Sequence, residues 1–289
     1  MDFFTIKGSS TPYRLERDIY ERITLKQEPY YKGGKNYAIC PGCGNVIQII
    51  NLDNNNTSDS HRRLIKTYSR HVEKSIEGLS EYSREKYYTC PFSNPVNFSS
   101  TKKRMNDEEE NEIINIIKKY SDCLYKMVNG ISGIHFSYNK FKEMLENFLS
   151  SEGYNYLYIN KFNLPYGFLN MQKGINIYKQ AIYSEKGLSV EIKNAINEKS
   201  IYFHMLNYII EKKTEEYAEI KFYLRNHKIG QEAGEQSIEL VIFESRGNGD
   251  NNIIFNKRIE IDMYSFSIIM DETGSIRNIA DKVLKKVLK

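Results

Sequence analysis

The stretch "KNYAICPGCGNVIQII", residues 35–50, places two cysteines two residues apart on a turn of proline and glycine, directly before an apolar run. Pro41 fixes one backbone angle, while Gly42 and Gly44 allow the chain to pass close to both sulfur atoms. Such a turn directs two thiolates toward one point, as a tetrahedral ion such as zinc requires. We therefore expect residues 40–44 to supply half of a metal site and to fix the fold around it.

The remaining ligands are expected from two later segments of the same region. Cys90 opens a second Cys-Pro pair in "TCPFSNP", so we expect it on a loop that faces the first. His71 is the preferred histidine, and His61, at the edge of an asparagine-rich loop, is the substitute. The predicted metal ligands are Cys40, Cys43, His71 and Cys90. Because four protein ligands close the coordination shell, the zinc ion would be structural.

The Cys-Pro-Gly-Cys-Gly turn resembles the knuckle half of zinc ribbons and similar small zinc modules. The resemblance covers about five residues and specifies no function. A thioredoxin-like dithiol is the alternative, but Gly44 and the β-type run "NVIQII" disfavour the helix start that it needs. Cys123 shares a helical face with Tyr120 and Met127, so we expect a packed core thiol there.

Length and composition indicate a globular chain with one large domain or two modest ones. Its 289 residues are 40% hydrophobic, which is enough to build a core. Apolar runs such as "IINII" are far shorter than the roughly 20 residues that cross a bilayer, and the N-terminal segment lacks the pattern of a secretory signal. We therefore expect a cytoplasmic protein with no membrane partner. Abundant isoleucine, asparagine and lysine favour a bacterial or phage source.

Basic residues concentrate in the part of the chain that contains the cysteine pair. Residues 1–105 contain 17 Lys and Arg against 11 Asp and Glu, a net charge of +6, and the rest of the chain has a net charge of −2. Tyrosines lie between these cations, a combination typical of single-strand or RNA binding. The predicted nucleic-acid-binding residues are Lys35, Arg62, Arg63, Lys66 and Arg70. A surface that binds a protein partner has a similar composition, so both kinds of partner stay open.

The composition changes near residue 100 and divides the chain into two predicted domains. Residues 1–100 are the basic zinc-binding module with its N-terminal lead-in, and residues 106–289 are an α+β domain. The linker between them leads into a helix that Asn106 or Asp107 caps and Gly130 ends. Apolar residues at helical spacing predict helices within residues 107–213, at 107–130, 138–151, 189–198 and 200–213.

From residue 217 the apolar residues alternate with polar ones. The segments "AEIKFYLR", "SIELVIFE" and "RIEIDMYSF" predict antiparallel strands over residues 217–270, with one face toward water. Residues 275–289 are amphipathic and predict a helix packed on the sheet. The predicted fold class is therefore α+β: a small zinc-stapled N-terminal module, a helical region, and a C-terminal antiparallel sheet with a closing helix.

The sequence contains no recognised catalytic motif. It lacks a phosphate-binding loop, a dinucleotide fingerprint, Gly-x-Ser-x-Gly and His-Glu-x-x-His. His61 and His71 follow Ser60 and Arg70, neither of which could help to bind a catalytic ion. We therefore expect a zinc-stabilised binding protein, a nucleic-acid or protein-interaction factor of a bacterial or phage system, with defence and mobile elements as candidate settings. The alternative is a metal-dependent nuclease or another enzyme with an unrecognised site.

Overall fold

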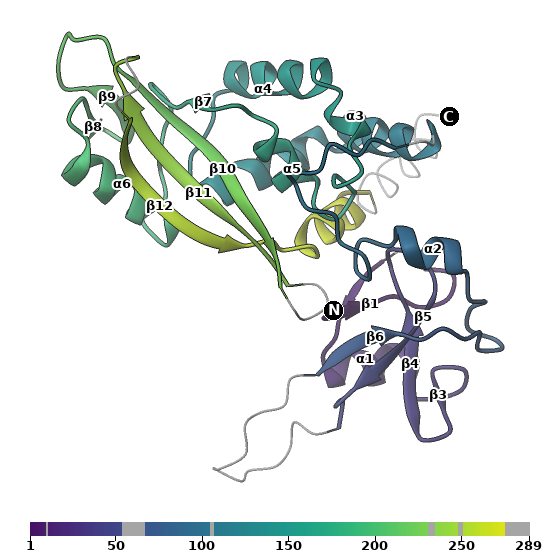
Figure 1. Cartoon of the computed structure of the whole chain (residues 1–289). Coiled ribbons are helices and arrows are strands. Elements are labelled where there is room, and N and C mark those ends of the chain that lie inside the picture. Colours follow the sequence, from purple (N-terminus) through teal and green to yellow (C-terminus); the bar gives the residue numbers. More distant parts are fainter. Residues whose placement is uncertain (10, 54–66, 105–106, 231–234, 248–250, 275–289) are drawn as a thin grey trace, which may run out of the picture. The chain divides into compact units, whose positions relative to one another are not determined.

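The computed structural model describes residues 1–289 except 10, 54–66, 105–106, 231–234, 248–250 and 275–289 (Figure 1). The chain has two compact units. The first contains Met1–Val96 and the described residues of Ile229–Glu235 and Met263–Lys289, and the second contains Asn97–Lys228 and Gln236–Asp262. Helices and several antiparallel sheets give the predicted α+β class. No helix among the described residues combines the length and the hydrophobicity needed to cross a membrane.

A four-stranded antiparallel sheet forms the centre of the first unit. Its order is β3-β4-β5-β6, and the strands span Tyr31–Lys32, Lys35–Ile39, Val46–Ile50 and Tyr68–His71. Tyr37 pairs with Gln48, which pairs with Arg70, and Ile47 pairs with His71. Because side chains alternate between faces, Tyr37 and Arg70 share one face and His71 lies on the other. The β-type run after Gly44 forms the central strand β5.

A small core covers the face of this sheet that contains Tyr37. The core residues are Tyr37, Ile39, Val46, Ile76 and Leu79, with Tyr30 and Val72 packed against them. Helix α1 (Arg17–Thr24) contains Tyr20, which is fully buried. The Tyr20 hydroxyl lies 2.9 Å from the carbonyl oxygens of both Tyr30 and Tyr37. One aromatic side chain thus fixes α1 to the sheet and satisfies buried main-chain acceptors.

Residues from both ends of the described chain meet in the first unit. Strand β1 (Phe3–Phe4) pairs with β2 (Tyr13–Arg14). Helix α2 of the same unit spans Arg84–Thr89. A helix at 265–274 follows Tyr264, whose ring centroid lies 4.6 Å from the Arg14 guanidinium carbon. The Thr11 hydroxyl donates to the Asp271 carboxylate at 3.0 Å. The predicted single boundary near residues 100–106 does not include this return of residues 263–274 to the first unit. The predicted helix at 275–289 lies outside the described residues.

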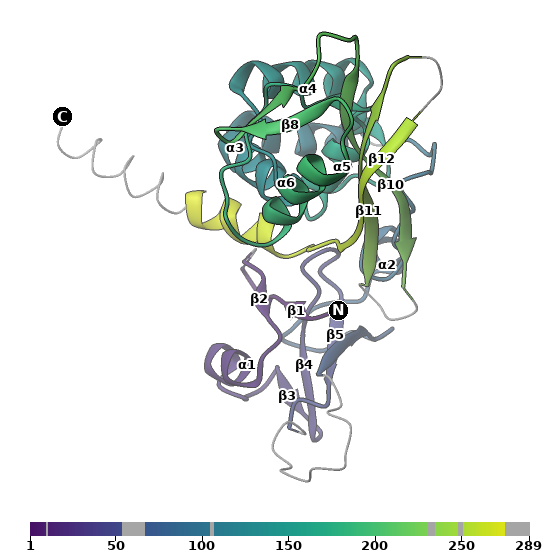
Figure 2. The ribbon, with the colours of Figure 1, turned by 90° about the vertical axis from the view of Figure 1, so that its left-hand side faces the viewer.

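The second unit is a sheet with helices on one side (Figure 2). The sheet order is β12-β11-β10-β7, and the strands span Asn251–Glu260, Gln236–Ser245, Glu219–Ile229 and Ile175–Asn176. The helices are α3 (Asp107–Ser132), α4 (Tyr138–Ser150), η2 (Gly153–Asn155), α5 (Leu164–Asn170) and α6 (Leu188–Lys199). Alternate residues of β10 and β11, such as Phe222 and Leu240, are fully buried. The alternation seen in the sequence therefore marks the face that packs on the helices.

The predicted helices at 138–151 and 189–198 are confirmed by α4 and α6, and the first long helix differs at its end. Helix α3 continues past Gly130 to Ser132 and has non-helical backbone angles at Tyr120. Gly133 follows the helix with φ of +69°. This left-handed conformation is the usual helix end and favours glycine, so Gly133 and not Gly130 ends the helix.

The predicted helix at 200–213 is wrong. This segment forms a hairpin of β8 (Phe203–Leu206) and β9 (Ile209–Lys212). The fully buried carboxylate of Glu244 accepts hydrogen bonds from the Ser200 hydroxyl and from the backbone N–H groups of residues 201 and 202. These donors turn the chain out of α6, so a contact with β11 overrides the local helical spacing.

The predicted strand region at 217–270 is also partly wrong. Strand β12 ends at Glu260, and residues 265–274 are helical. The alternation in "RIEIDMYSF" thus continues beyond the strand into a segment that belongs to the first unit. Short alternating runs fit both a strand end and one turn of a helix, which is why periodicity did not separate them.

Candidate metal centre

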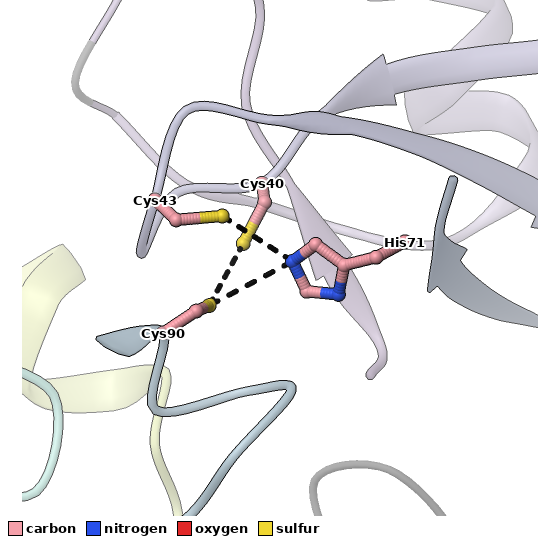
Figure 3. Close-up of side chains that lie close together, drawn as sticks. All are labelled: Cys40, Cys43, His71 and Cys90. Atoms are coloured by element: carbon pink, nitrogen blue, oxygen red, sulfur yellow. Dashed lines mark hydrogen bonds between the residues drawn. The ribbon is translucent and has the colours of Figure 1, made fainter. Parts of the chain in front are cut away.

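The structure brings Cys40, Cys43, His71 and Cys90 together in the first unit (Figure 3). Their ligand atoms all lie within 4.8 Å of one another. The sulfur atoms of Cys40 and Cys90 are 3.6 Å apart. The His71 Nε2 atom lies 3.4 Å from the sulfur of Cys43 and 3.7 Å from that of Cys90. Three sulfur atoms and one imidazole nitrogen therefore surround one point and could hold a metal ion.

The first two ligands lie on a tight turn between β4 and β5. Cys40 follows β4 directly, and the Gly44 N–H donates to its carbonyl oxygen at 2.8 Å. Gly44 has φ of +73°, a conformation that favours glycine. The backbone N–H of Asn45 donates to the sulfur of Cys43. The turn thus aims both sulfur atoms inward and supplies a main-chain hydrogen bond to one of them.

The second loop repeats this arrangement after α2. Cys90 caps the C-terminus of that helix, and the backbone N–H of Phe92 donates to its sulfur. The Asn94 N–H donates to the Cys90 carbonyl at 2.9 Å and closes the turn. At Gly42, an added Cβ would lie 2.8 Å from the Phe92 ring and 3.3 Å from the Cys90 sulfur. Glycine at position 42 is thus required because the two loops pack directly against each other.

Hydrogen bonds away from the ligands hold the two loops in register. The Asn45 amide donates to the Ser83 carbonyl at 2.9 Å and accepts from the Ser83 N–H at 2.7 Å. Ser83 also caps α2, because its side chain accepts from the Lys86 N–H. Asn45 is 1% exposed. A residue within the first loop therefore orients the helix that leads to Cys90.

The cluster is electrostatically unfavourable for three thiolates at once. Burial is the main cause that raises the pKa of Cys40 well above its usual value. Hydrogen bonds from Cys40 and Cys43 lower the pKa of Cys90. The hydrogen bond with Cys40 lowers the pKa of Cys43, but the bond to Cys90 and burial outweigh it and raise that pKa to about 11. One negative charge is thus stable among the thiols, whereas a bound cation would stabilise all three thiolates.

No disulfide joins the four cysteines, all of which lie in described residues. The four clustered side chains could hold a metal ion. Comparison with protein families, curated proteins and solved structures finds no match to the chain. The function thus has to be argued from the residues themselves.

The other predicted residues are distributed differently from the ligands. Cys123 is buried in α3 of the second unit and does not belong to the cluster. Lys35 begins β4 and Arg70 lies in β6, and both are exposed on the sheet face opposite His71. The remaining predictions, His61, Arg62, Arg63 and Lys66, lie outside the described residues.

A basic pocket lies on the first unit beside β3 and β4. Its volume is about 390 Å³, and its walls include Lys32, Lys35, Tyr37, Lys74 and Glu77. The Lys74 ammonium lies 5.0 Å from the Tyr37 ring centroid and donates to the Tyr37 hydroxyl at 3.2 Å. Among the described residues, no carboxylate forms an ion pair with any of the three lysines. The sequence showed each cation and the tyrosine but not that they surround one pocket, because Lys74 lies far from Lys35 along the chain.

Proposed function

We propose that this protein is a zinc-stabilised binding factor whose first unit recognises nucleic acid. The observation that supports the proposal is the basic pocket lined by Lys32, Lys35 and Lys74. The pocket lies on one face of the sheet, and the Cys/His cluster lies on the opposite face. In this proposal, a metal ion in the cluster stabilises the fold of the first unit, and the pocket binds the nucleic acid. The two parts of the proposal have separate tests.

Zinc is the metal that this ligand set favours. Three thiolates and one imidazole are a common structural zinc set, and bond lengths of about 2.3 Å to sulfur and about 2.0 Å to nitrogen place neighbouring ligand atoms about 3.5 to 3.8 Å apart in a tetrahedron. Three contacts among the four ligand atoms are 3.4, 3.6 and 3.7 Å, and all of these atoms lie within 4.8 Å of one another. Four protein ligands leave no position for a substrate or for a reactive water molecule. The ion would thus stabilise the first unit and would not catalyse a reaction.

The pocket chemistry fits a phosphate group. Lys32, Lys35 and Lys74 supply ammonium groups without a carboxylate partner among the described residues, and Tyr37 supplies a hydroxyl. Nucleic-acid backbones are bound chiefly through cations of this kind, which release counterions when they bind. Arg70 shares the sheet face with Tyr37 and extends the positive surface along β6. These features support the single-strand or RNA binding expected from the sequence.

The metal proposal predicts about one equivalent of zinc in freshly purified protein. Elemental analysis measures this directly. Cys90→Ser should lower the zinc content strongly, whereas Cys123→Ser, the matched change outside the cluster, should leave it unchanged. Less than about half an equivalent of zinc in the native protein would contradict the proposal.

The nucleic-acid proposal predicts salt-dependent binding of a fluorescein-labelled oligothymidylate, measured by anisotropy. Affinity should fall steeply as salt rises, and the triple change Lys32→Ala, Lys35→Ala and Lys74→Ala should reduce both the affinity and the salt slope. A matched control replaces three exposed lysines of the second unit, Lys118, Lys126 and Lys142, by alanine. A flat salt response, or equal losses in the two triple variants, would argue against this function.

The alternative of a metal-dependent nuclease has less support. The Nε2 atom of His71 faces the sulfur atoms of Cys43 and Cys90 and is therefore committed to the cluster. No other group of three or more His, Cys, Asp or Glu side chains in the described part of the chain lies close enough to hold an ion. Cleavage of the oligonucleotide in the presence of magnesium or manganese would instead support the nuclease hypothesis.

A further inference from the structure

Five aromatic rings form a continuous row on the surface of the second unit. Successive ring centroids are 5.4 Å apart from Tyr138 to Tyr125, 5.9 Å to His135, 5.2 Å to Tyr183 and 6.2 Å to Tyr208. Tyr138, Tyr183 and Tyr208 are 80%, 57% and 50% exposed. Exposed large side chains are ordinary when scattered, but a contiguous set marks an interaction site. We call these five residues the aromatic row.

Main-chain hydrogen bonds hold three parts of the aromatic row side by side. The N–H of His135 donates to the Ala181 carbonyl at 2.7 Å, and the Ala181 N–H donates back at 3.3 Å. The N–H of Ile182 donates to the Tyr208 carbonyl at 2.8 Å. The segments that present His135, Tyr183 and Tyr208 are thus joined by a short ladder. A surface held in this way loses little conformational freedom when a ligand binds.

Tyr208 occupies a backbone conformation that disfavours its side chain. It lies with Asn207 in the two-residue turn between β8 and β9, and their φ angles are +69° and +47°. Such turns favour Asn-Gly, because a residue with a Cβ atom is crowded at positive φ. Half of the tyrosine side chain is exposed. A strained and exposed aromatic side chain indicates a role in binding rather than in folding.

Two lysines beside the aromatic row are paired with carboxylates. The Lys193 ammonium lies 5.2 Å from the Tyr208 ring centroid and pairs with Glu185 at 2.9 Å. Lys140, two residues after Tyr138 in α4, pairs with Glu143 at 2.6 Å. A strand of phosphates would need unpaired cations at this surface. The paired charges instead favour a ligand without net charge.

We propose that the aromatic row binds a proline-rich peptide in the polyproline II conformation. A polyproline II helix has no internal hydrogen bonds, so its carbonyl oxygens are available acceptors. The proline rings of such a peptide pack against aromatic side chains. The hydroxyls of Tyr138, Tyr183 and Tyr208 have no hydrogen-bond partner among the described residues and can donate to these carbonyls. The inference goes beyond the proposed nucleic-acid function, because it concerns a different surface in a different unit.

The test uses the full-length protein and a fluorescein-labelled polyproline peptide of about ten residues, which spans about 31 Å. Anisotropy should show binding that changes little with salt. The double variant Tyr183→Ser with Tyr208→Asn should weaken binding at least about tenfold, and asparagine tolerates the positive φ. Tyr138→Ser, at the exposed start of α4, should weaken binding by itself. Tyr217→Ser is the matched control, because Tyr217 is 66% exposed and lies outside the row.

Three results would overturn the proposal. The first is no peptide binding by the native protein at about 1 mM peptide, the weakest range of specific affinity. The second is an equal loss in Tyr217→Ser. The third is binding of oligothymidylate that the double variant loses while the peptide remains unbound, which would assign the aromatic row to single-stranded nucleic acid. Unchanged amide exchange of β10–β12 in each variant shows that the second unit remains folded.

Discussion

The two units of this chain bury different clusters of polar side chains. In the second, an extensive set of buried apolar residues packs between the sheet and the helices, and one buried carboxylate, that of Glu244, is satisfied by four donors. In the first, large apolar side chains such as Phe4 and Tyr20 are also fully buried, and four side chains that could hold a metal ion lie close together. The second unit thus buries a carboxylate that its own donors satisfy, whereas the first buries three thiols whose charged forms a bound cation would stabilise.

The largest expected effect comes from removal of the metal ligands. Structural zinc contributes apparent binding free energies of about 10 kcal/mol or more, which exceeds the stability that a small module obtains from its core. Cys90→Ser, or a chelator, should therefore abolish amide-exchange protection in β4, β5 and β6 and leave that of β10–β12 intact.

Cys123→Ser provides the matched control, because Cys123 is buried in α3 of the second unit. It should leave β4–β6 protected. Loss of protection in both units after Cys90→Ser would show that the two units unfold together and would break the comparison.

The next effect concerns Glu244 in the second unit. Its carboxylate accepts from the Ser200 hydroxyl at 2.5 Å, the Ile201 N–H at 2.8 Å and the Asn252 amide at 2.8 Å. Glu244→Leu leaves these donors buried without an acceptor, so we expect a loss of about 3 kcal/mol in the free energy of unfolding. Urea denaturation of the second unit measures the loss.

Glu260→Leu is a suitable control, because Glu260 is an exposed residue at the end of β12. It should change the free energy of unfolding by less than about 0.5 kcal/mol. Similar losses in the two variants would mean that Glu244 contributes nothing beyond an ordinary surface acid.

A smaller effect of opposite sign is expected at the β8–β9 turn. Tyr208→Gly removes a Cβ atom at φ of +69°, so the free energy of unfolding should rise by about 1 kcal/mol. The same variant should bind the polyproline peptide more weakly. Thermal unfolding measures the gain in stability, and anisotropy measures the loss of peptide binding. No gain in stability in Tyr208→Gly would mean that the turn is not strained.

The smallest effect is a pH dependence from His227. This buried ring accepts from the Phe98 N–H at Nδ1 and lies 3.0 Å from the Gln236 amide oxygen at Nε2. Its pKa is lowered, chiefly by burial. The folded unit thus binds fewer protons than the unfolded chain, so its free energy of unfolding should fall as pH decreases below about 6.5.

His227→Gln should remove part of this dependence, because glutamine does not titrate. The comparison is between urea midpoints at about pH 7.5 and about pH 5.5. If the urea midpoint changes equally between these two pH values in the native protein and in the variant, another group causes the acid sensitivity.

Local chemistry identified a large part of this molecule. The two Cys-Pro turns led to Cys40, Cys43 and Cys90, because residues that build a tight turn around a metal are adjacent in sequence. His71 was preferred to His61 because His61 lies at the edge of an asparagine-rich loop, and the structure places His71 at the end of β6. Helix α4 was equally accessible, because Ser137 caps it and its apolar residues repeat at helical spacing.

Other features depended on contacts between distant residues. The hairpin at 203–212 forms because β11 presents Glu244 to the end of α6, and nothing within the hairpin reports that acceptor. The basic pocket joins Lys35 to Lys74, and the aromatic row joins Tyr138 to Tyr208 through segments paired in space. The sequence by itself thus determined turns and ligand types, which depend on neighbouring residues, whereas only the tertiary structure decided which distant side chains share a surface.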